Sequence, residues 1–251
     1  MIPVIDVSFS IVMIVFALLL GGILKGAVGM GAPVIAVPVI ASFFDVKIAV
    51  ALMVLPNFST NIWQLWTYRS NSIPGMFRWV FAIAGAVGAI LGTVMLVNFA
   101  ASTLKAMIAA AVLGYVFLRV SRPNFAISTT LANRLAIPMG TLAGVLQGAA
   151  GVSAPVSVSF LNAMNLSRAV FIPTISLFFV AMTLVQIPLL VAVKVMTPQV
   201  LLLGIAALVP LSIGMPIGAL AAKSISAKAF DRLVLILLVG LSLKLIADAV
   251  L

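Results

Sequence analysis

The sequence predicts an all-α polytopic membrane protein with about ten transmembrane segments, arranged as two inverted five-segment repeats with broken Gly-Pro hairpins. Three observations support this prediction: long hydrophobic runs, a chain that is 65% hydrophobic and only 7% charged, and a glycine-proline motif that occurs twice. A soluble domain usually carries about a quarter charged residues. The hydrophobic runs are continuous and do not alternate with polar residues, so they predict spanning helices and not the strands of a barrel.

The hydrophobic runs define the expected membrane segments, which are residues 8–27, 32–44, 47–68, 77–97, 102–119, 131–149, 154–164, 168–192, 198–221 and 227–249. At about 1.5 Å per residue, most of these ranges are long enough to cross a hydrocarbon core of about 30 Å. The ranges 32–44 and 154–164 would reach only about 15–20 Å. Because each follows a glycine-rich stretch, we expect both to be half-helices.

The two short segments belong to an internal repeat. Residues 22–34 (GILKGAVGMGAPV) align with residues 144–156 (GVLQGAAGVSAPV) at an offset of 122, with eight of thirteen positions identical. The chain therefore reads as one membrane domain made of two repeats, 1–122 and 123–251. Five segments in each repeat is an odd number, so the second repeat would enter the membrane from the opposite side. Many secondary transporters share this inverted topology.

The charges indicate how the chain lies in the membrane. Fourteen Lys and Arg residues, against four acidic ones, are scattered singly between the apolar runs. This distribution follows the positive-inside rule and does not form a stripe for binding nucleic acid. With the segments above, one side collects Arg69, Arg78, Arg119, Arg122, Arg134, Arg168, Lys223, Lys228 and Arg232. We expect this side to be cytoplasmic, with the protein in the plasma (inner) membrane and both termini outside.

The residue inventory argues against an enzyme. The chain has no cysteine and no histidine, and its only carboxylates are Asp6, Asp45, Asp231 and Asp248. Groups for acid–base catalysis and for metal ligation are therefore nearly missing. We expect no catalytic residue, no metal site and no cofactor, although a coupling cation such as sodium is compatible with the sequence. The expected partners are a small anion and the lipid bilayer, without nucleic acid.

The two hairpins have the features of an anion site. Gly29 and Gly31 interrupt the first hairpin, and Gly151 and Ser153 occupy the second. A proline that suits the first turn of a new helix follows each break. Helix N-termini at membrane depth present unpaired N–H groups and the positive end of the helix dipole. Two inverted copies would direct two such ends at one central region, which favours an anion.

Lys25 lies inside the first hydrophobic run, next to the first break. A charge there costs at least about 2.5–3.5 kcal/mol on insertion scales. One interpretation makes Lys25 a fixed cation that faces a substrate anion, while the aligned Gln147 supplies neutral donors. The other places Lys25 at a helix end, from which its side chain extends to the membrane interface.

Polar residues also follow one face of the helix after each hairpin. They recur at helical spacing and are Asn57, Asn61 and Gln64 in the first repeat, and Ser176, Thr183 and Gln186 in the second. Amides and hydroxyls on such a face would line a polar cavity and suit sulfonate or carboxylate oxygens. Alternatively, they would form hydrogen bonds between packed helices.

Glycines elsewhere have the spacing of tightly packed membrane helices. They are Gly85, Gly88 and Gly92 in one segment, and Gly214 and Gly218 in another. At an offset of 126, Gly92 aligns with Gly218. We expect these glycines to be structural.

The motifs together resemble those of the TauE/SafE sulfite-exporter family. The resemblance rests on the hairpins Gly29-Met-Gly31-Ala-Pro33 and Gly151-Val-Ser-Ala-Pro155, and on the later GAILG and GMPIG segments. It covers essentially the whole chain and implies a carrier of sulfite, organosulfonates and other sulfur-containing anions. The residues alone indicate an anion of small to moderate size. We therefore expect a secondary transporter that works by alternating access. The alternative is an anion channel with a fixed pore through the same hairpins.

Overall fold

The computed structural model describes residues 7–71, 73, 75–121, 126–224, 236, 239, 240, 243 and 247. Within these residues the chain is helical and contains no strand. The helices are α1 (Val7–Val28), α2 (Ala32–Phe43), α3 (Val46–Thr67), α4 (Phe77–Asn98), α5 (Ala101–Ser121), α6 (Thr129–Ala150), α7 (Ala154–Ala163), α8 (Arg168–Ala192) and α9 (Pro198–Ser224). The expected segment 227–249 lies almost entirely outside the described residues.

Both hairpins break where the glycines predict. Gly29 and Gly31 separate α1 from α2 with φ angles of 86° and 99°, and Gly151 ends α6 with a φ of 69°. These left-handed conformations suit glycine because it has no Cβ. Each following helix carries a proline in its first turn, and α2 and α7 have only 12 and 10 residues. The two expected half-helices are confirmed, each ending one residue earlier than predicted.

Among the described residues, five helices are long and apolar enough to cross a membrane: α1, α3, α4, α8 and α9. Within α5, residues Ala101–Gly114 count as a shorter apolar helix, whereas α6, with 22 residues, is less apolar. In α6 the first turns carry Thr129, Thr130, Asn133 and Arg134. The all-helical architecture is therefore confirmed, while the number of ten spans stays a prediction.

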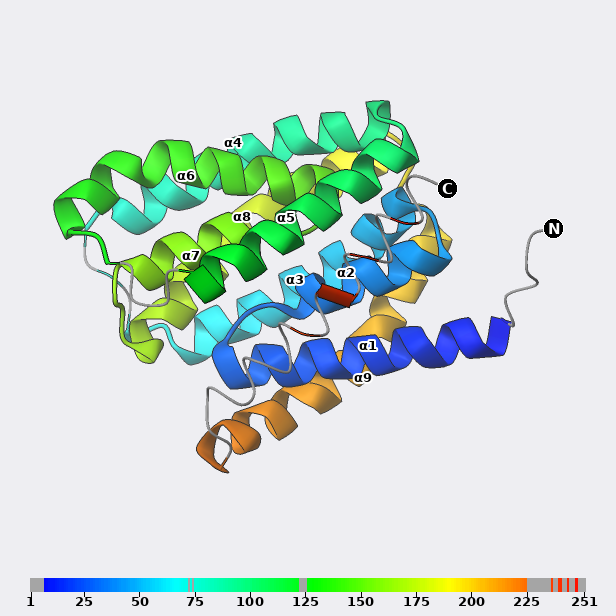
Figure 1. Cartoon of the computed structure of the whole chain (residues 1–251), viewed down its shortest axis with the longest axis horizontal. Coiled ribbons are helices and arrows are strands. Elements are labelled where there is room, and N and C mark those ends of the chain that lie inside the picture. Colours follow the sequence, from blue (N-terminus) through cyan, green and yellow to red (C-terminus); the bar gives the residue numbers. More distant parts are fainter. Residues whose placement is uncertain are drawn as a thin grey trace.

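Two long helix pairs lie at opposite sides of the bundle, α4 with α6 and α1 with α9 (Figure 1). Glycines allow the backbones of each pair to touch. A Cβ on Gly92 would overlap the carbonyl oxygen of Val145 in α6, and a Cβ on Gly218 would overlap that of Ile23 in α1. The structural interpretation of these glycines is thus supported. Between the pairs, α3 packs against α8.

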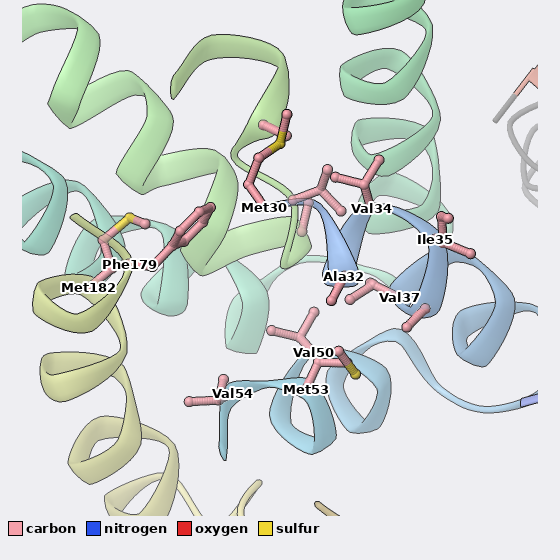
Figure 2. Packing of buried hydrophobic residues seen from close by; sticks show 14 of the residues in the cluster. Met30, Ala32, Val34, Ile35, Val37, Val50, Met53, Val54, Phe179 and Met182 are labelled. Carbon is pink, nitrogen blue, oxygen red and sulfur yellow. The ribbon is translucent and has the colours of Figure 1, made fainter. Parts of the chain in front are cut away.

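The first half-helix lies in the protein core. Nearly all of α2 is buried, including both prolines. Figure 2 shows its side chains beside those of Val50 and Met53 in α3, in one buried cluster that also includes Met30, Phe179 and Met182. Because protein surrounds it, the turn between α1 and α2 can leave helical geometry without exposing its backbone to lipid.

Candidate functional site

The structure buries every residue predicted for the site. Lys25 comes from α1, and the hairpin turns contribute Gly29, Gly31, Gly151 and Ser153. The remaining side chains come from three helices: Asn57, Asn61 and Gln64 from α3, Gln147 from α6, and Ser176, Thr183 and Gln186 from α8. In an apolar bundle, polar side chains at such depth are costly unless they are paired or serve a ligand.

Lys25 is the charged group at this depth. Its side chain is 0% exposed. Its Nζ donates a hydrogen bond to Oδ1 of Asn61 at 3.0 Å and lies 5.9 Å from the ring centroid of Phe179. The interpretation that Lys25 extends to the membrane interface is therefore wrong, because the ammonium ends inside the bundle.

The network continues from Asn61 to Asn57, one turn earlier in α3. Asn61 Nδ2 donates to Oδ1 of Asn57 at 2.8 Å and to its carbonyl oxygen at 2.7 Å. The Nδ2 atom of Asn57 is buried and has no partner among the described residues. A buried donor without a partner costs about 1–3 kcal/mol. Lys25 and Asn57 thus supply donor groups to one buried region.

The polar faces of α3 and α8 also bond to their surroundings. Ser176 donates to Oε1 of Gln64 at 3.3 Å, which joins the two helices. Thr183 donates to the carbonyl of Phe179 within its own helix at 2.8 Å. Gln186 Nε2 donates to the carbonyl of Gly148 at 3.4 Å. Part of this polar set therefore serves helix packing, as the second interpretation of the sequence expected.

Spare hydrogen-bonding atoms remain in the second half of the chain. The Oε1 atoms of Gln147 and Gln186 are buried and have no partner among the described residues. Ser153 lies in the second hairpin, and its Oγ is 3.4 Å from Oγ of Ser157. The hydroxyl of Ser157 donates to the carbonyl of Ser153 at 3.0 Å. The unpaired oxygens of Gln147 and Gln186 therefore belong to the second half of the chain, whereas the donor groups of Lys25 and Asn57 belong to the first.

Two neighbours of the site were missed by the sequence analysis. Phe179 stands beside Lys25, although the residues are far apart in sequence and no motif links them. Arg168 was assigned to topology alone, yet its Nη2 donates to the carbonyl of Gly26, near the end of α1, at 3.1 Å. Both contacts form only when α8 packs beside the first hairpin.

A buried lysine with an amide network, inside a hydrophobic helical bundle with two half-helices, defines a polytopic membrane protein with a polar interior. The family model for the sulfite exporter TauE/SafE matches residues 14–245. The chain therefore belongs to the TauE/SafE family of membrane sulfite and anion exporters, as the resemblance of its hairpins implied. Members of this family are membrane transporters. No curated protein and no solved structure matches the chain.

Proposed function

We propose that the protein is a secondary transporter of a sulfonate or sulfite-like anion in the plasma (inner) membrane, and that Lys25 and Asn57 bind this anion. One observation carries the proposal: the ammonium of Lys25 is fully buried, and in the described part of the chain its hydrogen-bond partner is the neutral Asn61 and its aromatic neighbour is Phe179. Asp45, the carboxylate within that part, is exposed at the N-cap of α3.

The electrostatics of this region favour an anion. A buried charge that lacks an opposite charge is strongly unfavourable, and a bound anion supplies the missing partner. Sulfonate and sulfite each present three oxygens that accept hydrogen bonds. Lys25 Nζ has donor capacity beyond its bond to Asn61, and Asn57 Nδ2 has no other partner among the described residues. Charge-assisted hydrogen bonds of this kind are roughly twice as strong as neutral ones.

The helix pairs support the inverted repeat as the framework for alternating access. If residues 1–122 and 123–251 are equivalent units, α1 corresponds to α6 and α4 to α9. The pair α4–α6 then corresponds to the pair α9–α1, and both pairs are present with glycines at their contacts. In transporters of this design, one unit moves against the other around a central site. We propose the same motion here.

Lys25→Gln tests the anion site, with Lys194→Gln as the matched control because Lys194 is exposed between α8 and α9. We expect the Lys25 variant to bind an organosulfonate at least about tenfold more weakly, a loss of about 1.4 kcal/mol. The Lys194 variant should bind like the parent. Binding is measured on purified protein by ligand-induced thermal stabilisation. Unchanged affinity in a folded Lys25 variant would show that Lys25 does not bind the anion.

A flux assay in proteoliposomes separates a transporter from a channel. The solutes compared are sulfite, taurine, sulfoacetate, an arylsulfonate, sulfate and chloride. We expect saturable flux of the sulfur-containing anion and acceleration by the same anion on the opposite side, because one site alternates between the two faces. Unsaturable currents carried equally by chloride would instead support a fixed pore.

A further inference from the structure

We propose that the second half of the chain holds a binding site for a sodium ion, formed by the side-chain oxygens of Gln147 and Gln186 and by the carbonyl of Gly148. These residues lie where the C-terminal end of α6 packs against α8. Sodium binding does not depend on the anion. A role for sodium as coupling ion, however, rests on the proposed transport function.

Two buried side-chain oxygens in this region, Oε1 of Gln147 and Oε1 of Gln186, have no hydrogen-bond partner among the described residues. Gln147 and Gln186 are 3% and 0% exposed. The amide of Gln186 is oriented by its Nε2, which donates to the carbonyl of Gly148 at 3.4 Å. This bond leaves Oε1 as the free atom. Buried polar atoms in native proteins nearly always have a partner, so two unpaired acceptors in one region point to a ligand.

The end of α6 is the second observation. The helix ends at Ala150, and the amide of the following Gly151 donates to the carbonyl of Gln147 at 2.8 Å. The last carbonyls of a helix lack partners within the helix and carry the negative end of its dipole. One of them, the carbonyl of Gly148, accepts from the amide of Gln186, and Gln147 is the residue before it in the chain, so this end of α6 brings together carbonyl and amide groups. Acceptors at a helix C-terminus favour a cation.

The nature of the oxygens selects the cation. Amide and carbonyl oxygens are neutral, and the one described carboxylate, Asp45, lies elsewhere at the N-cap of α3. Calcium sites are usually built with carboxylates, and magnesium retains several waters. Carbonyls at broken helices in transporters bind sodium instead. A monovalent cation such as sodium is the class that this site fits.

Comparison of the two halves gives the third observation. Gly26 and Lys25 in the first half align with Gly148 and Gln147 in the second. The carbonyl of Gly26 accepts a hydrogen bond from the guanidinium of Arg168 at 3.1 Å, and the residue before Gly26 is Lys25. In the first half, the protein therefore supplies two positive groups, the ammonium of Lys25 and the guanidinium of Arg168 at the Gly26 carbonyl. In the second half, the corresponding groups are the neutral amides of Gln147 and Gln186, and a sodium ion would supply the positive charge there.

The test measures sodium binding to the purified full-length protein. Thermal stability is followed as sodium chloride replaces N-methyl-D-glucamine chloride, which keeps the chloride concentration constant. A ligand that binds the folded state raises stability as its concentration passes its dissociation constant. We expect sodium-dependent stabilisation, and we expect Gln147→Leu and Gln186→Leu to weaken it at least about tenfold. Gln199→Leu is the matched control, because Gln199 is exposed in α9.

A second variant covers the case in which the leucine variants do not fold. Gln186→Glu keeps an oxygen at the same position and adds a negative charge, so it should bind sodium more tightly than the parent. The sodium site is wrong if the parent shows no sodium-specific stabilisation. It is also wrong if the folded leucine variants respond like the parent, or if Gln186→Glu does not strengthen the response.

Two further arms separate this inference from its alternatives. Lys25→Gln should retain the sodium response, so loss of sulfonate binding alone would contradict the transport proposal and leave the sodium site standing. The free oxygens could also receive an ammonium group of the substrate. In that case the Gln147→Leu and Gln186→Leu variants would lose binding of 2-aminoethanesulfonate but keep binding of 2-hydroxyethanesulfonate, and sodium would not stabilise the parent. This result would mean that the oxygens bind the substrate and that the sodium site is wrong.

Discussion

Asn61 is the residue on which the buried network depends, because it contacts both of its neighbours. Its Oδ1 accepts from Lys25 Nζ at 3.0 Å, and its Nδ2 donates to Asn57. The amide therefore holds the ammonium in place without neutralising it. A neutral partner leaves the positive charge of the lysine available to an anion, whereas a carboxylate at the same position would occupy it.

Asn61→Asp tests this argument at the scale of one side chain. The new carboxylate would lie beside Lys25 and form an internal ion pair, so we expect organosulfonate binding to fall at least about tenfold, or about 1.4 kcal/mol. The fold should persist, because the buried cation gains a partner. Asn162→Asp is the matched control at an exposed position near the end of α7. Thermal-shift titration with the sulfonate measures both variants, and equal affinities would contradict the argument.

At the scale of helices, backbone contact at glycines holds the two long pairs together. A Cβ on Gly92 would overlap the carbonyl of Val145, and a Cβ on Gly218 would overlap that of Ile23. Gly114 in α5 has nothing within 4 Å of the same position. Membrane helices gain much of their association from such close packing.

Replacement by alanine should therefore lower the stability of the protein at Gly92 and Gly218, but not at Gly114. We expect Gly92→Ala and Gly218→Ala each to destabilise the protein by about 1–3 kcal/mol, because the helices must separate to admit a methyl group. Gly114→Ala should be neutral or slightly stabilising, because alanine favours a helix by about 1 kcal/mol over glycine. Melting temperatures of the purified variants check the prediction. A similar fall for all three variants would contradict the prediction, because a methyl group on Gly114 meets nothing within 4 Å.

The helices also show which parts of the structure the sequence could predict. The hairpin breaks were placed correctly because glycine and proline act on their own backbone, and their effect does not depend on distant residues. For Lys25 the sequence left two interpretations open, an inward-facing cation and a side chain at the membrane interface, and the structure shows it fully buried. Its contacts with Asn61 and Phe179 could not be predicted, because they form only when α1, α3 and α8 pack together. Arg168 was missed for the same reason, since its partner Gly26 lies 142 positions away.

At the scale of the whole molecule, the charges give the bundle a direction. Arg69 follows the end of α3 and Arg78 begins α4, whereas Lys105 lies near the start of α5. Figure 1 shows the start of α4 and the start of α5 at opposite ends of the bundle. The positive-inside rule then predicts that the end with Arg69 and Arg78 faces the cytoplasm.

Single cysteines can establish this orientation directly, because the chain has none of its own. Ser70 and Ser102 are exposed and lie at the opposite ends of α4, beside its start and beyond its end. We expect a membrane-impermeant maleimide added to intact cells to label Ser102→Cys but not Ser70→Cys, and to label both after permeabilisation. The unmodified parent, which lacks cysteine, is the control for background. The reverse labelling pattern would contradict the prediction and place the end with Arg69 and Arg78 outside the cytoplasm.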